Sequence, residues 1–197
     1  MKVLMINGSP RPRGCTFTAL SVVAEALNRE GVETEIVQSG AGALRDCIGC
    51  RKCRENGDSR CIFNDDVVNG IIAKAEQADG FVFGSPVYYA HPSGRILSLL
   101  DRLFYAGSEA FMNKPGAAVV SARRAGTTAS LEQIFYHQQN AGGFFPLLEY
   151  GARTDAGRRH AGCRRVAGNG TVGEEHGVAA EMYRRRKTGG HSAAAAG

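Results

Sequence analysis

Residues 2–20 read KVLMINGSPRPRGCTFTAL, and this stretch decides the fold. Its apolar run Val3–Ile6 is typical of a short strand that is buried on both faces of a parallel sheet. A loop rich in Gly, Ser and Pro follows at residues 8–14, and apolar residues then recur at helical spacing until Gly31. A helix that begins after such a loop favours an anion, because its first N–H groups lack helical partners and its dipole is positive there.

The loop predicts a site for a single phosphate. Neither GxxxxGK[ST] nor GxGxxG is present in it, so the triphosphate and dinucleotide fingerprints are both absent. Hydroxyl and guanidinium groups are available as donors on Ser9, Arg11, Arg13, Thr16 and Thr18. Taken alone, the stretch leaves open an ordinary turn between a strand and a helix, with no ligand.

Length and charge restrict the class of protein. The chain has 197 residues, of which 43% are hydrophobic, which suits one α/β domain. No apolar run approaches the roughly 18 residues of a membrane span, and the first apolar run is too short for a signal peptide, so we expect a cytoplasmic protein. The net charge is +1 over residues 1–135 and +4 over residues 136–197, so the patterned part shows no basic surface for nucleic acid.

Strands and helices are predicted to alternate along the chain. Strands are expected at residues 32–38, 80–84 and 116–121. One helix is expected to follow Asp65 or Asp66, either of which could be its N-cap. Two more helices are expected, over residues 96–104 and from Thr127 or Thr128 onward. This alternation predicts parallel βαβ units. Three loops then leave carboxyl ends of strands, where such sheets bind ligands: Ser9–Thr16, Ser85–His91 and Ser121–Gly126.

The second and third loops carry side chains that suit a flat ring system. Tyr88 and Tyr89 have aromatic faces that pack on such a ring, although core positions would suit them equally. Arg123 and Arg124 offer charge, although solvated arginines are commoner than ligand contacts. The coincidence of the three loops at one sheet edge is what favours a binding site.

The three loops together resemble the NADPH-dependent FMN reductases of the flavodoxin-like superfamily. The resemblance covers roughly residues 1–134 and rests on NGSPRPRGCT (Asn7–Thr16), GSPVYYAHPSG (Gly84–Gly94) and SARRAGTT (Ser121–Thr128). It implies a three-layer α/β/α fold around a parallel sheet of order 2-1-3-4, with a fifth strand that this sequence does not show clearly. One departure is Ala125, where relatives often carry glycine; if that position needed φ > 0, alanine would cost about 1 kcal/mol.

The resemblance also implies a cofactor and a reaction. The FMN phosphate would be held by Ser9, Arg11, Thr16 and Thr18. The isoalloxazine would be lined by Pro86, Val87, Tyr88 and Tyr89, with Ser121, Arg123 and Gly126 on its other edge. NAD(P)H would be the co-substrate and a flavin, quinone or nitroaromatic the acceptor; no side chain is assigned a catalytic role, because the flavin carries the reaction. A homodimer is implied if the C-terminal region is intact.

Four cysteines form the pattern C-x2-C-x2-C-x7-C at Cys47, Cys50, Cys53 and Cys61. In a cytosolic chain this spacing indicates metal chemistry rather than disulfides. A [4Fe–4S] cluster, tetrahedral zinc and plain reduced thiols all remain open. The pattern resembles the compact motif of iron–sulfur flavoproteins, which implies an alternative function: an FMN/[4Fe–4S] electron-transfer flavoprotein that serves protein partners.

Residues 135–197 do not have the pattern of a folded segment. From residue 136 onward there are twelve Gly and eleven Ala but five residues among Leu, Val and Ile. Composition alone predicts a disordered basic tail. Shifting the reading frame by one nucleotide, with free choice of wobble bases, converts parts of the tail into sequences that resemble the last strand and last helix of these reductases. We therefore interpret the tail as an out-of-frame product from about residue 135 onward.

Overall fold

The computed structural model describes residues 1–140, 152–153 and 164–165, with side chains up to residue 137. In chain order its elements are β1 (Lys2–Asn7), α1 (Cys15–Arg29), β2 (Glu33–Gln38), α2 (Lys52–Glu55), α3 (Val68–Glu76), β3 (Gly80–Tyr88), β4 (His91–Pro92), α4 (Gly94–Ala106), α5 (Ser108–Phe111), β5 (Gly116–Ser121), α6 (Thr127–Asn140), β6 (Ala152–Arg153) and β7 (Arg164–Arg165).

The main sheet is parallel, with the order β2-β1-β3-β5. Its register places Met5 opposite Ile36 on one side and Val82 on the other. The short strand β4 forms an antiparallel hairpin with the end of β3. The α/β class and the predicted order of the four long strands are therefore confirmed.

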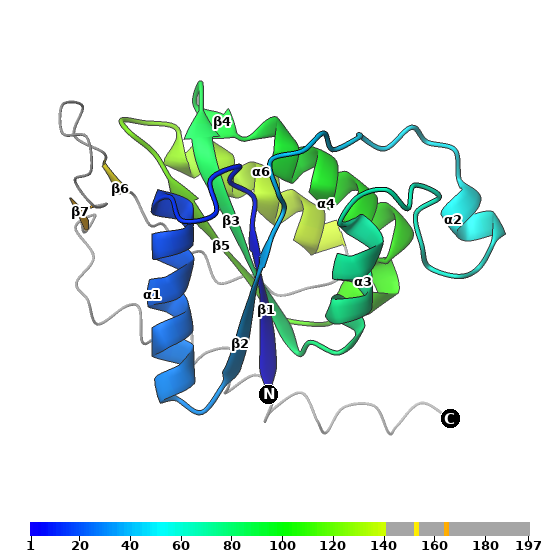
Figure 1. The fold of residues 1–197 in the computed structure, drawn as a ribbon, viewed down its shortest axis with the longest axis horizontal. Coiled ribbons are helices and arrows are strands. Elements are labelled where there is room, and N and C mark those ends of the chain that lie inside the picture. Colours follow the sequence, from blue (N-terminus) through cyan, green and yellow to red (C-terminus); the bar gives the residue numbers. More distant parts are fainter. Residues whose placement is uncertain (141–151, 154–163, 166–197) are drawn as a thin grey trace.

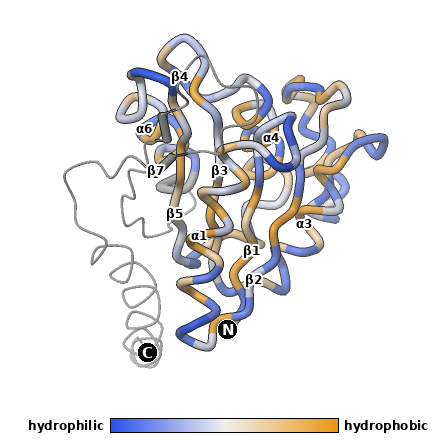
Figure 2. Tube along the Cα trace, turned by 60° about the vertical axis from the view of Figure 1, so that its left-hand side comes forward, coloured by the Kyte–Doolittle hydropathy of each residue, from blue (hydrophilic) through white to orange (hydrophobic). Residues whose placement is uncertain are grey.

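Helices cover both faces of this sheet (Figure 1). Because side chains alternate along a strand, Leu4 and Ile6 of β1 pack against α3, α4 and α6, whereas Val3 and Met5 pack under α1. All four side chains are fully buried, and each such burial contributes about 1.5–3 kcal/mol. Figure 2 shows the hydrophobic residues running along β1 and β5, inside the layers of helices. The predicted doubly buried strand is confirmed.

Strand β3 is longer than the predicted segment 80–84. Residues 85 and 86 pair with Val120 and Ser121 of β5, and residues 87 and 88 pair with β4. Backbone partners on two sides therefore keep the chain extended as far as Tyr88, and the second loop is shortened to a tight hairpin turn.

Helix α3 begins at Val68, and Val67 rather than an aspartate occupies the N-cap position. The N–H of Val68 nevertheless donates to Oδ1 of Asp66 at 3.1 Å. Of the two predicted capping carboxylates, Asp66 therefore satisfies a helix N–H, while Asp65 pairs with Arg45.

Helix α6 continues across residue 134, where we expected the patterned domain to end. Ile134 is fully buried, and the imidazole of His137 lies 2.8 Å from Oδ1 of Asp101 on α4. Packing against the domain thus extends at least to His137. The expected fifth strand lies outside the described residues, and so does the tail from residue 141 onward, apart from β6 and β7. Within the described part of the chain, no helix is both long enough and apolar enough to cross a membrane.

Candidate functional site

The three predicted loops meet at the carboxyl edge of the sheet. The N–H of Gly8, in the first loop, donates to the carbonyl of Gly84 at 2.8 Å. The hydroxyls of Thr16 and Ser121 lie 2.8 Å apart, which joins the start of α1 to the end of β5. Parallel pairing of β1, β3 and β5 makes these contacts possible, because it places their carboxyl ends side by side.

Gly84 allows the start of α1 to approach the sheet closely. A Cβ at this position would lie 2.9 Å from Cγ2 of Thr16 and 2.8 Å from Cδ1 of Leu20. Such distances are too short for carbon atoms, so a larger residue would push α1 away from β3. The absence of a side chain at Gly84 therefore sets the depth at which Thr16 sits.

The first loop has the chemistry of an anion site. Helix α1 begins after Gly14 without a side-chain cap and without an acidic residue in its first turn. Ser9 and Thr16 are buried beside it, while Arg11 and Arg13 are exposed at its rim. An uncapped helix start, buried hydroxyls and nearby guanidinium groups fit a phosphate group.

The backbone around Ser9 is held by residues that the sequence analysis missed. Gln38 at the end of β2 donates to the Ser9 carbonyl at 2.5 Å and accepts from the amide of Asn7 at 2.6 Å. Oδ1 of Asn7 accepts the Ser9 N–H at 3.1 Å, and Ser9 Oγ accepts the Arg11 N–H at 3.2 Å. The sequence signal for this network was the polar residue at the end of each of two neighbouring strands, Asn7 in β1 and Gln38 in β2.

Ser93 is a second residue that sequence reasoning missed. Its hydroxyl caps α4 by accepting the Ile96 N–H at 3.3 Å, and it donates to the carbonyl of Gly8 at 3.2 Å. The Ser93 N–H donates to Ser85 Oγ at 3.0 Å. Ser93 therefore connects the first loop, the second loop and α4. A serine that directly precedes an apolar helix was its sequence signal.

The second loop is a hairpin with exposed tyrosines. Tyr89 is 100% exposed and Tyr88 is 47% exposed, which excludes the core positions that the sequence left open for them. Tyr89 and Ala90 form a two-residue turn with φ values of 50° and 64°, the left-handed pair that tight hairpins use. Pro86 and Val87 are half-buried at the base of this hairpin.

The third loop packs against the hairpin through Gly126. Its φ is +94°, and a Cβ there would lie 2.3 Å from Cα of Ala90. Ala125 does not have positive φ, so the strain that we considered for it does not arise. Arg123 and Arg124 are exposed on this loop.

The cysteines gather at a second location, beside α2 and α4. One pocket is lined by Cys47, Ile48, Cys50, Arg51, Cys53, Cys61, Ile62, Phe63, Arg102, Tyr105 and Ala106. We call this the cysteine pocket. Burial raises the pKa of the Cys53 thiol, although backbone N–H groups partly offset this effect. Within the described residues no three Cys, His, Asp or Glu side chains are arranged as metal ligands, but four thiols at one pocket are the donor set that an iron–sulfur cluster requires.

Cys61 is the most firmly held of the four cysteines. Its N–H donates to Oδ1 of Asn69 at 2.8 Å, and its carbonyl accepts from Nδ2 of Asn69 at 2.8 Å. Nε of Arg102 donates to its sulfur at 3.3 Å. Cys53 is tied more loosely, with its sulfur 3.7 Å from the carbonyl oxygen of Tyr105.

Comparison with known proteins decides the family. The model of the NADPH-dependent FMN reductase family matches residues 1–152, which is more than half of the chain. The chain belongs to this family. Membership of the NADPH-dependent FMN reductase family places it among flavin-dependent oxidoreductases and confirms the resemblance inferred from the three loops.

Curated proteins with similar sequences are named iron–sulfur flavoproteins. One from Methanocaldococcus jannaschii is 38% identical over 138 residues, which cover 68% of this chain and 69% of the relative. One from Archaeoglobus fulgidus is 36% identical over 61% of this chain, and the match spans 59% of that relative.

Solved structures confirm the flavodoxin-like fold. A flavodoxin from the domain Archaea superposes with a TM-score of 0.59 at 13% identity, covering 95% of this chain and 99% of its own. A flavone reductase superposes with a TM-score of 0.66 at 14% identity, covering 98% of this chain and 65% of its own. At these identities the likeness concerns the fold alone.

The fold of this FMN reductase family member brings the three loops that carry the predicted flavin residues to one edge. Thr16 and Ser121 touch each other there, Gly126 packs against the hairpin at Ala90, and Ser9 is buried in the first loop. Thr18 does not join them, because its hydroxyl donates to the carbonyl of Gly14 at 3.3 Å on the exposed side of α1. Their roles as ligands remain predictions.

Proposed function

We propose that the protein is a cytoplasmic FMN-dependent NAD(P)H oxidoreductase that passes electrons to a small molecule such as a flavin, a quinone or a nitroaromatic. The observation that carries this proposal is the junction of the first and third loops through Thr16 and Ser121, beside the uncapped start of α1. Family membership supports the flavin, and the family's name supports the nicotinamide.

The chain's own residues would bind and orient the cofactor. Ser9, Arg11 and Thr16 would hold the phosphate at the start of α1, where the helix dipole favours negative charge. Ser9 Oγ accepts the Arg11 N–H and the Thr16 hydroxyl pairs with Ser121, and a hydroxyl can both donate and accept, so a phosphate would add a partner to each. A bound FMN would supply the hydride and electron transfer that no side chain provides.

The hairpin and the third loop would form the two walls around the ring. Tyr88 and Tyr89 present aromatic faces outside the core, as packing against a flat ring requires. Gly126 keeps the third loop in contact with the hairpin, so the separation of the two walls is fixed by packing. Arg123 would add a positive charge at the edge of the ring. None of these side chains needs to donate or accept a proton.

The cysteine pocket favours a second candidate function, an FMN/[4Fe–4S] electron-transfer flavoprotein that serves protein partners. Cys47, Cys50, Cys53 and Cys61 would be the ligands, and the names of the relatives support this assignment. A bound cluster would supply one-electron transfer. Helix α4 connects the two regions: Ser93 at its N-cap contacts the first loop, and Arg102 lines the pocket about 14 Å along the helix axis.

Turnover tests the first candidate and separates it from the second. Protein purified without air and supplied with FMN is mixed with NADPH or NADH and a quinone, and nicotinamide oxidation is followed. The oxidoreductase should turn over with one of the nucleotides, whereas a pure electron carrier should oxidise neither beyond a blank that contains free FMN. A flavin-free protein that cannot be loaded would refute both candidates. We also propose a homodimer on the condition that the C-terminal region is intact, and sedimentation of the same sample tests it.

A further inference from the structure

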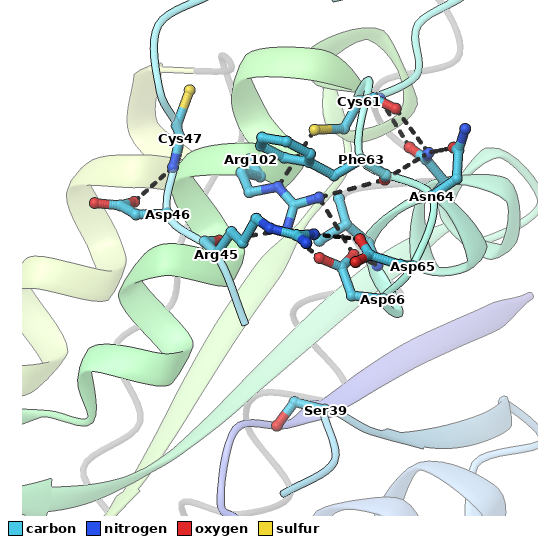
Figure 3. A network of polar contacts seen from close by, with 12 residues as sticks. Ser39, Arg45, Asp46, Cys47, Cys61, Phe63, Asn64, Asp65, Asp66 and Arg102 are labelled. Carbon is cyan, nitrogen blue, oxygen red and sulfur yellow. Dashed lines mark hydrogen bonds and ion pairs between the residues drawn. The ribbon is translucent and has the colours of Figure 1, made fainter. Parts of the chain in front are cut away.

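Arg102 is a buried cation that points at a cysteine. It lies on α4, and its side chain is 1% exposed. Its guanidinium pairs with the carboxylate of Asp66 through both terminal nitrogens, and these also approach the carbonyls of Arg45 at 3.3 Å and Phe63 at 3.5 Å. The remaining donor, Nε, points at the sulfur of Cys61 at 3.3 Å (Figure 3).

This arrangement differs from an ordinary structural ion pair. The terminal nitrogens of Arg102 already donate to Asp66 and to the two carbonyls. The remaining donor, Nε–H, has the Cys61 sulfur as its acceptor. A neutral thiol is a weak acceptor, whereas an anionic sulfur is a strong partner for a buried cation. An arginine guanidinium keeps its charge in proteins, and Asp66 pairs with it here, so Nε–H points a cation at the sulfur.

Two cations line the cysteine pocket: Arg51 is exposed, whereas Arg102 is buried and donates to the Cys61 sulfur. No acidic side chain lines the cysteine pocket, and Asp66 lies behind Arg102, where the N–H of Val68 also holds it. Arg45 is close by but turns away, since it pairs with Asp65 and covers the ring of Phe63 at 4.8 Å. Figure 3 shows Arg102 between Cys61 and Asp66.

We propose that Arg102 is a positioning residue of the cysteine pocket: it holds Cys61 in place and, through its Nε–H bond to that sulfur, raises the reduction potential of the iron–sulfur cluster. The inference rests on the cluster of the proposed function. Hydrogen bonds and positive charge at a ligand sulfur stabilise the more negative, reduced state of a cluster. Asp66 acts in the opposite sense, because it offsets part of the charge of Arg102.

The test compares reduction potentials of the reconstituted cluster in four proteins: wild type, Arg102→Gln, Asp66→Asn and Arg45→Gln. Arg102→Gln should make the potential more negative, by at least the 59 mV that corresponds to a tenfold change in a one-electron equilibrium. Asp66→Asn should move it in the positive direction. Arg45→Gln, which removes a neighbouring charge with no bond to a cysteine, should leave it close to that of the wild type.

Two further variants allow for loss of folding. The double variant Asp66→Asn with Arg102→Gln leaves no buried charge unpaired, and its potential should still be more negative than that of the wild type. Arg102→Lys keeps the charge but loses the fork of donors, so its potential should lie between those of wild type and Arg102→Gln. Loss of iron from Arg102→Gln with FMN retained would also support the positioning role.

The outcomes distinguish failure of the proposed role of Arg102 from failure of the proposed iron–sulfur cluster. A wild-type protein that takes up no cluster refutes the cluster itself, and the inference with it. A wild-type protein with a cluster, together with Arg102→Gln and Asp66→Asn potentials equal to that of Arg45→Gln, refutes only the role of Arg102. Shifts of the same sign in Arg102→Gln and Asp66→Asn would indicate general loosening of the pocket and would also overturn the inference.

Discussion

Replacing Thr16 by valine tests the junction on which the flavin site depends. Valine has nearly the same shape as threonine, so the change removes the hydroxyl and leaves the methyl group that faces Gly84 in place. Thr16 is 2% exposed, and its hydroxyl lies 2.8 Å from that of Ser121, which is itself 9% exposed. The variant therefore leaves the Ser121 hydroxyl buried without this partner.

Two magnitudes follow from this geometry. An unsatisfied buried hydroxyl costs about 1–3 kcal/mol, so the free energy of unfolding should fall by that amount. If Thr16 also donates to the phosphate of FMN, a hydrogen bond to a charged group worth about 1.5–3 kcal/mol is lost, which weakens FMN binding by roughly 10- to 150-fold. The double variant Thr16→Val with Ser121→Ala should be more stable than the sum of the single changes predicts.

The assay is urea unfolding together with FMN titration followed by quenching of flavin fluorescence. Thr34→Val is the matched control. Thr34 bonds to Asn28 at an exposed site near the start of β2, whereas the proposed flavin site lies at the carboxyl ends of the strands. It should leave FMN affinity unchanged. If folded Thr16→Val binds FMN as tightly as Thr34→Val does, Thr16 is not a ligand, and the placement of the phosphate at the start of α1 is wrong.

Four further predictions follow. Gly126→Ala should cost about 1–3 kcal/mol in urea unfolding, since its Cβ would meet Ala90 at φ +94°, whereas Gly31→Ala, with φ +75° and free space, should cost only about 1 kcal/mol; equal losses would show that the loop contact is unimportant. Cys61→Ser should abolish iron binding after anaerobic reconstitution while FMN is retained, and unchanged iron content would exclude Cys61 as a ligand. Hydrogen bonds from Lys2, and then from Lys74, lower the pKa of Glu35 below its ordinary value of 4.5. The ionised carboxylate therefore stabilises the folded protein above pH 4.5, and this contribution is lost as the pH falls through the lowered pKa. The difference in the free energy of unfolding between wild type and Glu35→Gln should be at most about 1 kcal/mol at neutral pH and should shrink in acid. Sequencing of the locus should reveal a frame lesion near the codon for residue 135, and an uninterrupted read that encodes the tail would remove that interpretation.

Local patterns predicted the parts of the fold that depend on neighbours in the sequence. The apolar run of β1, the glycine-rich loop and the spacing of α1 are all contained within residues 2–30, so the first strand–loop–helix unit was read correctly. The extension of β3 to Tyr88 was not predicted, because it depends on pairing with β4 and β5. The exposure of Tyr89 likewise follows from the hairpin turn, which the sequence alone does not show.

The polar framework of the site was harder to predict. Ser93 and Gln38 each had a local signal in the sequence, but the loop whose backbone they bond is distant in sequence, so only the fold identifies that partner. Arg102 was missed because an arginine on an amphipathic helix usually faces solvent. Here it lies beside Leu99 and Leu103 on the buried side of α4, and only the fold brings Asp66 and Cys61 to it.

Anaerobic titration of the FMN-loaded protein with NADPH tests the central claim most directly. The flavin absorption band should bleach as the nucleotide is added, bleaching should be complete near one equivalent per FMN, and a quinone should restore the band. Protein that retains FMN but shows no bleaching with NADPH or NADH would contradict the assignment as a nicotinamide-dependent oxidoreductase.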